Sequence, residues 1–263
     1  MSSYVDEDVA LPNSVLGKAQ LLLAAFESGA VRLRLSELSR RSGVPKASAY
    51  RLAQELAQWG LLDRHEETYQ LGMRLFQLGQ RVPASAVLRS VARPLLTDLF
   101  ARTRATIHLA VLDGTHVLFL EKIAGEASVH THSHVGGRLP ASCTATGKLL
   151  LALAPDGQQN AALLAHGAGL PGLTDRSVRS EDTLKRQLIA VQRQRFAHEV
   201  GEVRAGYASL AVPVPDPDGT VRAALSATAP VSEVSVERLL PLLRMTAAGV
   251  TRGLADQAAP PVR

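Results

Sequence analysis

Hydrophobic residues recur at spacings of three and four in the first quarter of the chain, which is the pattern of amphipathic helices. This pattern predicts three successive helices, over Val15 to Phe26, Ser36 to Ser42 and Pro45 to Gly60. Gly43 suits the left-handed residue that follows a helix, and Pro45 suits a first helical turn. The third helix is expected to turn four residues inward, namely Ala49, Leu52, Ala53 and Leu56.

A hairpin is predicted after the third helix. Its strands are Leu61 to Arg64 and Thr68 to Gly72, and the charged stretch from His65 to Glu67 forms the turn. A short helix, a glycine turn, a polar-faced helix and a hairpin, in this order, are the plan of a winged helix-turn-helix. The polar face of the third helix would enter a major groove about 12 Å wide while the hairpin reaches neighbouring phosphates. The alternative is a small all-helical packing module.

The rest of the chain predicts an α+β domain in which strands and helices are segregated. Two hairpins in succession imply an antiparallel sheet. The expected strands are Thr106 to Leu112, His116 to Ile123, Ser128 to Val135, Ala208 to Pro213 and Val221 to Thr228. The expected helices are Met73 to about Arg81, Val87 to Arg102, Ala145 to Leu153, Gln158 to Leu164, Ser180 to Gln194 and Ser235 to Leu254, with a linker at Val82 to Ser85.

Composition restricts the class of protein. The 263 residues suggest two domains, and 46% hydrophobic with 20% charged residues exclude whole-chain disorder. No stretch approaches the roughly 20 unbroken apolar residues of a membrane span, so we expect no membrane contact. The first eight residues carry three acids and no base, unlike a secretory signal. A single cysteine, Cys143, excludes an internal disulfide and a four-cysteine zinc site, so we expect a cytoplasmic protein.

Positive charge is concentrated near the N-terminus. The net charge is +5, and residues 9–81 contribute +4 with ten bases and six acids. This distribution fits a polyanion-binding module, although a solvated basic face would look the same. We predict that four residues of the third helix contact the edges of DNA bases and phosphates, namely Lys46, Ser48, Tyr50 and Arg51. Contacts mainly to the DNA backbone are predicted for Ser36, Arg40, Arg41, Arg64 and Tyr69.

Three groups of segments resemble the IclR family of bacterial one-component transcription regulators. The groups are Pro45 to Leu52 (PKASAYRL) with Gly60-Leu61-Leu62, Gly136 to Pro140 (GGRLP) leading to Thr144 to Lys148 (TATGK), and Ala211 to Val214 (AVPV) with Gly219 ahead of Ala223 to Ser226 (AALS). The match covers about Asn13 to Leu254, and the GGRLP loop joined to its helix start is specific to the family. The resemblance implies a winged helix-turn-helix, a linker helix and a GAF-like effector domain that assembles as dimers or tetramers.

The resemblance sets the expected domains and function. We predict a winged helix-turn-helix domain over residues 13–74, a linker helix region over 75–86, and an effector-binding and oligomerisation domain over 87–256. The expected protein is a ligand-responsive regulator, a repressor, with a double-stranded DNA operator and a small carboxylic acid as partners. It is expected to form a homodimer or homotetramer, to need no cofactor and to catalyse no reaction. The residues themselves do not distinguish repression from activation.

The loop before Thr144 is a candidate ligand site for a physical reason as well. Gly136, Gly137 and Pro140 shape an irregular backbone, and the helix that follows offers free N–H groups and a positive dipole end to a carboxylate. The alternative is a structural turn without a ligand. The resemblance assigns the pocket to Ser128, Thr131, Ala145, Thr146, Glu199, Tyr207, Ser209, Ser226 and Thr228. Residues 141–143 depart from the family, which often has a larger residue and a histidine there, so the effector is not identified.

Other chemistry is less favoured. Residues 142–149 partly match a phosphate-binding loop, but Ser142 replaces its first glycine and Leu149 its last hydroxyl. Cys143 has no orienting acid, so we favour a packed or pocket-lining thiol over a nucleophile. Three alternating histidines share one strand face, where we favour a polar surface or interface over a metal site: His130, His132 and His134. The competing function is a small-molecule-binding enzyme with an accessory helical domain, for which only Glu199, Glu202 and these histidines could act.

Overall fold

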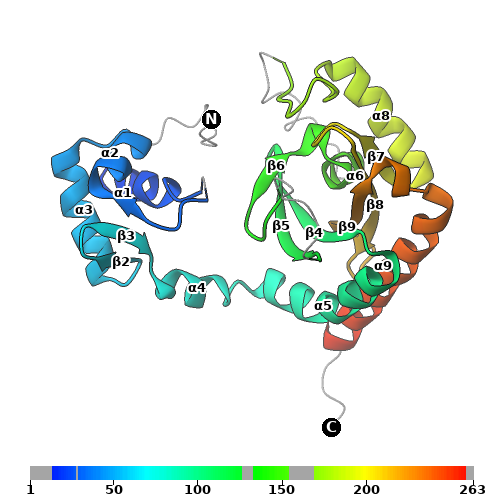
Figure 1. Ribbon diagram of the computed structural model, residues 1–263. Coiled ribbons are helices and arrows are strands. Elements are labelled where there is room, and N and C mark those ends of the chain that lie inside the picture. Colours follow the sequence, from blue (N-terminus) through cyan, green and yellow to red (C-terminus); the bar gives the residue numbers. More distant parts are fainter. Residues whose placement is uncertain (1–13, 28, 126–132, 154–168, 259–263) are drawn as a thin grey trace, which may run out of the picture. The chain divides into compact units, whose positions relative to one another are not determined.

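The computed structural model describes residues 14–27, 29–125, 133–153 and 169–258, and the chain divides into two compact units after Pro83 (Figure 1). None of the helices in these ranges is long and apolar enough to cross a membrane. Each unit has its own hydrophobic core. The units are therefore described separately.

The N-terminal unit consists of helices around a small sheet of three strands. Its elements are α1 (Val15–Ala24), β1 (Leu33–Arg34), α2 (Leu35–Ser42), α3 (Lys46–Gln58), β2 (Leu62–His65), β3 (Thr68–Leu71) and α4 (Met73–Gly79). The strand order is β1-β3-β2, and both pairs are antiparallel. The buried residues of α3 are the four that the periodicity predicts, Ala49, Leu52, Ala53 and Leu56. The predicted helix-turn-helix and hairpin are thereby confirmed.

The turn between α2 and α3 has a simple backbone cause. Gly43 adopts a left-handed conformation with φ of 69°, which a residue with a Cβ rarely adopts. Pro45 then supplies an extended residue directly before Lys46, the first residue of α3. The Ser39 hydroxyl donates a 2.7 Å hydrogen bond to the Val44 carbonyl across this turn. These features fix the direction in which α3 leaves α2.

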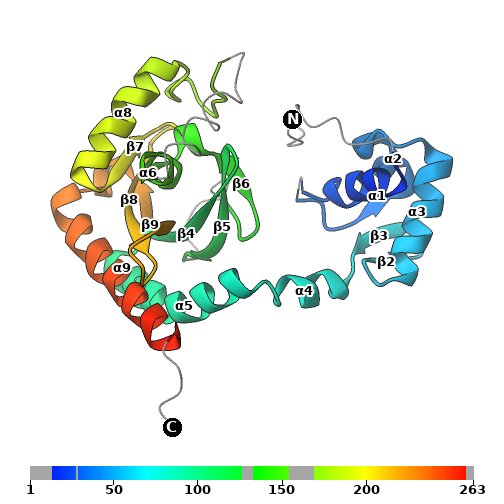
Figure 2. The same ribbon diagram turned by 180° about the vertical axis from the view of Figure 1, so that it is seen from behind.

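The C-terminal unit is an antiparallel sheet between two layers of helices. Its elements are α5 (Pro83–Thr103), β4 (Thr106–Asp113), β5 (His116–Ile123), β6 (Arg138–Pro140), η1 (Ala141–Cys143), α6 (Ala145–Leu153), α8 (Glu181–Gln194), β7 (Ala197–Val200), β8 (Tyr207–Pro215), β9 (Val221–Pro230), η2 (Val231–Glu233) and α9 (Val236–Ala258). The strand order is β6-β5-β4-β9-β8-β7. Figures 1 and 2 show α6 and α8 on one face of this sheet and α5 and α9 on the other. The predicted α+β class is confirmed.

Strand alternation explains where the sheet becomes polar. Ile107 and Leu109 of β4 belong to the core under α5 and α9, whereas Ala110 belongs to the core under α6. Successive side chains point to opposite faces, so His108 shares the α6 face with Ala110. Ser226 of β9 is the register partner of His108 and lies on the same face. The α6 side of the sheet therefore carries a polar patch within an apolar core.

Three expectations differ from the structure or fall outside it, and one observed strand was not expected. The strand beside β5 is β6, and residues 133–135 of the predicted strand are not part of a strand, because the chain turns through Gly136 with φ of 81°. Helix α5 begins at Pro83 rather than Val87, since proline is well suited to a first turn. Strand β7 was not predicted from the sequence. The helix expected at residues 158–164 lies outside the described residues.

Candidate functional site

A cavity lies between the start of α6 and the polar patch of the sheet. It encloses about 460 Å³ of space, the open solvent at its mouth included. Several strands, α6 and the loop before β8 contribute to its wall. The described lining residues are His108, Phe119, Ser133, Leu139, Thr144, Ala145, Thr146, Val203, Arg204, Ser209, Ser226 and Thr228.

The structure gathers most of the residues assigned to the pocket. The cavity wall includes Ala145, Thr146, Ser209, Ser226 and Thr228. Glu199 and Tyr207 do not line the cavity, but each contacts a residue that does. Ser128 and Thr131 lie outside the described residues. Residues from α6, β8 and β9, three separate parts of the sequence, therefore meet at one cavity.

The start of α6 presents hydrogen-bond donors to this cavity. Thr144 caps the helix, because its hydroxyl accepts a 3.0 Å hydrogen bond from the Gly147 amide. Within the described ranges, the amides of Ala145 and Thr146 have no hydrogen-bond partner, as expected for the first two residues of a helix. The positive end of the helix dipole lies at the same point. This arrangement suits an anion.

Two buried hydroxyls in the cavity wall also lack protein partners. Thr146 is 2% exposed and Ser226 is 3% exposed, and neither hydroxyl is hydrogen-bonded within the described part of the chain. The only fully enclosed side-chain N or O atom without a partner, among the described residues, is Gln187 Oε1. The two hydroxyls therefore keep contact with the cavity space. Buried polar groups in this state are normally satisfied by water or a ligand.

A hydrogen-bond network supports the cavity from behind. Ser209 donates to Glu199 Oε1 at 2.7 Å and contacts the Thr228 hydroxyl at 2.9 Å. The Glu202 amide donates to Glu199 Oε2 at 2.9 Å. Burial raises the pKa of Glu199 above its ordinary value, although these two hydrogen bonds oppose the change. Glu199 thus orients Ser209 without lining the cavity.

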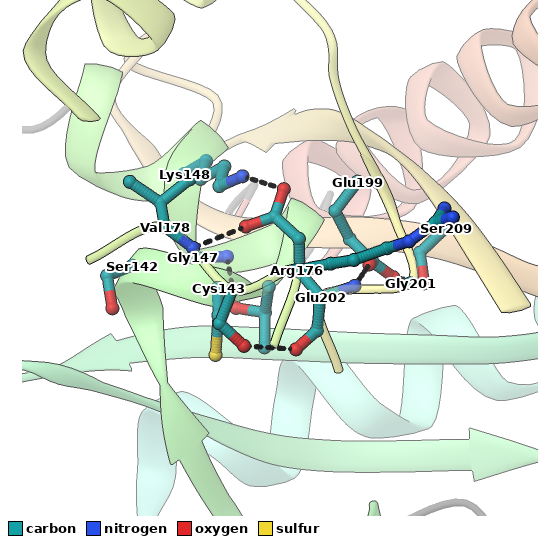
Figure 3. A network of polar contacts seen from close by, with 12 residues as sticks. Ser142, Cys143, Gly147, Lys148, Arg176, Val178, Glu199, Gly201, Glu202 and Ser209 are labelled. Carbon is teal, nitrogen blue, oxygen red and sulfur yellow. Dashed lines mark hydrogen bonds and ion pairs between the residues drawn. The ribbon is translucent and has the colours of Figure 1, made fainter. Parts of the chain in front are cut away.

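Lys148 is committed to a buried ion pair. Its ammonium group pairs with Glu202 Oε1, and Glu202 Oε2 accepts a 3.3 Å hydrogen bond from the Val178 amide (Figure 3). Lys148 is 1% exposed and Glu202 is 7% exposed. Because this lysine is held by Glu202, it is not available for a phosphate group. The geometry therefore opposes the phosphate-loop interpretation.

His108 and Arg204 line the cavity and were not predicted. His108 Nε2 lies 2.7 Å from the Ser133 hydroxyl, and burial, with a smaller effect of Lys122, lowers the pKa of His108 to about 3. His108 is therefore neutral at pH 7. Arg204 is half-buried, with Cζ 4.7 Å from the centre of the Tyr207 ring. Strand alternation with Ala110 was a usable signal for His108, whereas Arg204 lies in a loop without periodicity.

The candidate nucleophile and metal ligands have a different setting. Cys143 is buried, with Sγ 3.5 Å from the Pro140 carbonyl, and burial is the main cause that raises its pKa to about 12. Its thiol is therefore protonated at pH 7. No group of three potential metal ligands occurs among the described residues. His134 is exposed, and His130 and His132 lie outside those residues.

Most of the predicted DNA-contacting residues are exposed in the N-terminal unit. Exposed members are Ser36, Arg40, Arg41, Lys46, Tyr50, Arg51 and Arg64, and Ser48 is half-buried. The predicted contact of Tyr69 with the DNA backbone is corrected, since Tyr69 is 2% exposed and packs in the core. It points inward because it alternates with the neighbouring positions of β3, and its hydroxyl accepts a 3.4 Å hydrogen bond from Gln54. A direct contact of Tyr69 with the DNA backbone is therefore excluded.

Known proteins share both units. Residues 15–66 match the IclR helix-turn-helix domain, and residues 80–252 match the C-terminal domain of bacterial IclR transcriptional regulators. The HTH-type transcriptional regulator XynR of Escherichia coli is 33% identical over 82% of this chain and 86% of its own length. The p-hydroxybenzoate hydroxylase transcriptional activator of Acinetobacter baylyi is 31% identical over 88% of both chains.

A solved structure gives the same assignment. The IclR homolog from Microbacterium hydrocarbonoxydans, complexed with 4-hydroxybenzoate, has a TM-score of 0.84 and 31% identity over 92% of this chain and 100% of its own. The resemblance noted in the sequence is thus confirmed. The protein belongs to the IclR family of bacterial transcriptional regulators, and its N-terminal unit carries the DNA-binding helix-turn-helix domain of that family.

Proposed function

We propose that this regulator binds an operator as a repressor and that a small organic acid, bound in the cavity at the start of α6, changes its affinity for DNA. The observation that carries this proposal is the set of donors in the cavity wall that have no hydrogen-bond partner among the described residues. The amides of Ala145 and Thr146 and the hydroxyl of Ser226 lie in the wall of one cavity. A carboxylate has two acceptor oxygens, so it satisfies several of these donors at once.

A relative supports an acid as the effector. The Microbacterium hydrocarbonoxydans structure is complexed with 4-hydroxybenzoate, which is a carboxylate. The helix dipole at Ala145 favours negative charge, and a partly enclosed site screens that attraction less than water does. We therefore place the carboxylate at the helix start and the rest of the molecule against Ser209, Ser226 and Thr228.

DNA recognition is assigned to the exposed face of α3. Lys46, Tyr50 and Arg51 lie on this face and can reach base edges, while Arg41 and Arg64 suit phosphates. One recognition helix reads too few bases for a genome-sized search, so we propose a homodimer or homotetramer on a near-palindromic operator. We place the DNA-binding domain at residues 13–74, the linker at 75–86 and the effector and oligomerisation domain at 87–256. Its site of action would be the cytoplasm, where bacterial DNA lies.

We infer that the protein is not an enzyme. Glu199 and Glu202, the candidate bases, do not line the cavity and are held by Ser209, Lys148 and Val178. His108 does line it, but with a pKa of about 3 it is a weak base at pH 7. Incubation of each bound acid with the protein should return the acid unchanged. Conversion of more than one molecule of acid per molecule of protein would support the enzyme alternative.

The cavity is tested by calorimetry on the full-length protein. A panel of organic acids is titrated into wild type, into Ser226→Leu, which fills the cavity, and into Ser232→Leu, which makes the same change at an exposed position. Wild type and Ser232→Leu should bind the same acid, and Ser226→Leu should not. If no acid binds wild type, or if Ser226→Leu binds normally, the proposed site is wrong.

The switch is tested with DNA. Footprinting on the DNA that flanks the gene identifies the operator, and a reporter shows whether binding represses or activates. The acid should change operator affinity about 5- to 150-fold, and the operator must change acid affinity by the same factor. Unequal factors, or no effect of a bound acid, would contradict an effector role.

A further inference from the structure

We infer that Arg204 binds the carboxylate of the effector and makes the cavity select monocarboxylates over neutral molecules and dicarboxylates of similar shape. This inference rests on the proposed function, because it assumes that an organic acid occupies the cavity. It adds the residue that sets the charge of the ligand. Arg204 was not among the residues that the sequence assigned to the site.

The position of Arg204 suits a carboxylate. It lines the same cavity as Ala145 and Thr146, and its guanidinium carbon lies 4.7 Å from the centre of the Tyr207 ring. An aromatic contact of this kind uses the face of the guanidinium, while its donors lie in the plane. Because the guanidinium has five N–H donors, it can keep a contact with the protein and still bind both carboxylate oxygens. Tyr207 thereby acts as a positioning residue for Arg204.

The charges around the cavity make Arg204 decisive. Burial keeps His108 neutral, and Lys148 is neutralised by Glu202. Arg204 is consequently the only lining residue with a formal charge at pH 7 among those that the structure describes. The start of α6 adds a partial positive charge to the same space. One negative charge on the ligand is therefore matched.

A second carboxylate would not be matched. The remaining described wall consists of neutral side chains, chiefly Phe119, Leu139 and hydroxyl groups. Burying a charge without a partner is costly, so a dicarboxylate should bind more weakly than the monocarboxylate of the same shape. A neutral amide should also bind more weakly, because it loses the attraction to Arg204.

The test uses two matched sets of probes with full-length protein and calorimetry. One set is 4-hydroxybenzoate, 4-hydroxybenzamide and terephthalate, and the other is lactate, lactamide and malate. The variants are Arg204→Gln, Arg204→Lys and the control Arg193→Gln, which removes an exposed arginine that does not line the cavity. Thermal unfolding checks that each variant is folded.

In wild type, the monocarboxylate of at least one set should bind about tenfold or more tightly than its amide, as expected for charge-assisted hydrogen bonds. Arg204→Gln should weaken the acid by about 10- to 100-fold and leave the amide within about twofold of wild type. Arg204→Lys should give an intermediate loss, since lysine keeps the charge but not the planar donors. Arg193→Gln should match wild type.

The outcomes separate the two proposals. If acids bind Arg204→Gln as tightly as wild type while Ser226→Leu abolishes binding, Arg204 does not select the charge and the proposed function stands. Equal weakening of acid and amide in Arg204→Gln would also overturn charge selection. Tight binding of terephthalate or malate would overturn the restriction to monocarboxylates. If wild type binds no acid, the proposed function fails and this inference fails with it.

Discussion

Ser209, in the cavity wall, donates a 2.7 Å hydrogen bond to Glu199, a carboxyl that is 2% exposed behind that wall. Glu199 also accepts a hydrogen bond from the Glu202 amide, and the Glu202 carboxylate pairs with Lys148 on α6. One network thus joins strand β8, the loop before it and α6. A ligand that contacts both Ser209 and the start of α6 therefore lies against the two elements, β8 and α6, that this network joins.

The raised pKa of Glu199 predicts a loss of stability as pH rises. The folded state holds its proton above the ordinary value of 4.5, so folding favours the protonated form. Its stabilising contribution is complete below 4.5 and is lost as pH rises through the folded pKa. The free energy of unfolding of wild type minus that of Glu199→Gln should therefore fall with pH across this window, by at most about 1.4 kcal/mol per pH unit.

Ser209→Ala provides the check on this assignment. The Ser209 hydrogen bond favours the charged carboxylate, so its removal should raise the pKa of Glu199 further and extend the window upward. Urea unfolding at a series of pH values measures both effects. A difference between wild type and Glu199→Gln that is independent of pH would show that Glu199 is not the group that titrates.

The ion pair between Lys148 and Glu202 should be essential for stability. Lys148→Met leaves a buried carboxylate without its partner, and we expect a loss of about 3 to 5 kcal/mol in the free energy of unfolding. The double variant Lys148→Met/Glu202→Gln should recover part of this loss. Lys185→Met is the matched control, since it breaks a 3.6 Å pair with Glu181 whose side chains are 51% and 42% exposed. That change should cost at most about 0.5 kcal/mol.

The elements that could be predicted are those whose buried hydrophobic residues recur at a regular spacing in the sequence. In α3 the four buried positions follow spacings of three and four, so the helix and its inward face follow from the sequence. In β7 only Ala197 and Glu199 point inward, and a buried acid does not read as part of a hydrophobic pattern. The four-residue strand was missed for this reason.

The cavity could be predicted only in part, because polar residues in a cavity resemble surface residues in a sequence. Ser226 and Thr228 were found through a family resemblance and the two-residue strand period, whereas His108 and Arg204 were not. Tyr69 was misplaced because its polar tip suits an exposed strand, and only the observed packing shows that it is buried. Contacts between distant segments determine these positions, and periodicity contains no such information.

His108 predicts a loss of stability on the acid side. Its pKa falls from 6.5 to about 3 on folding, so the unfolded chain takes up a proton that the folded chain excludes. Stability is therefore lost as pH decreases from about 6.5 towards 3. The free energy of unfolding of wild type minus that of His108→Gln should decrease over this range, again by at most about 1.4 kcal/mol per pH unit. Urea unfolding measures it, and a constant difference would mean that His108 is not excluded from protonation.

Phosphate contacts predict the salt dependence of DNA binding. Arg41 and Arg64 are exposed, and Arg64 Nε is held by the Glu66 carbonyl at 3.0 Å near the hairpin turn. Each phosphate that a lysine or arginine side chain neutralises contributes roughly −0.9 to the slope of log affinity against log salt. Arg41→Ala and Arg64→Ala should each flatten the slope by about one unit, and Arg193→Ala should not. An unchanged slope in both variants would show that the phosphate contacts lie elsewhere.

Arg51 predicts how the operator is read. It is exposed on α3, one helical turn after Ala47, on the face opposite Leu52 and Ala53. If its guanidinium contacts a base edge, Arg51→Ala should reduce the discrimination between operator and random DNA by about 1 to 3 kcal/mol. Gln58→Ala, at the exposed far end of the same helix, is the control and should leave discrimination unchanged.

Fluorescence titrations on both DNAs at one salt concentration give the two affinities. Acid binding by Arg51→Ala should match wild type, because the cavity lies in the other unit. Equal losses on operator and random DNA would assign Arg51 to the phosphate backbone instead, since a backbone contact weakens binding to every sequence alike.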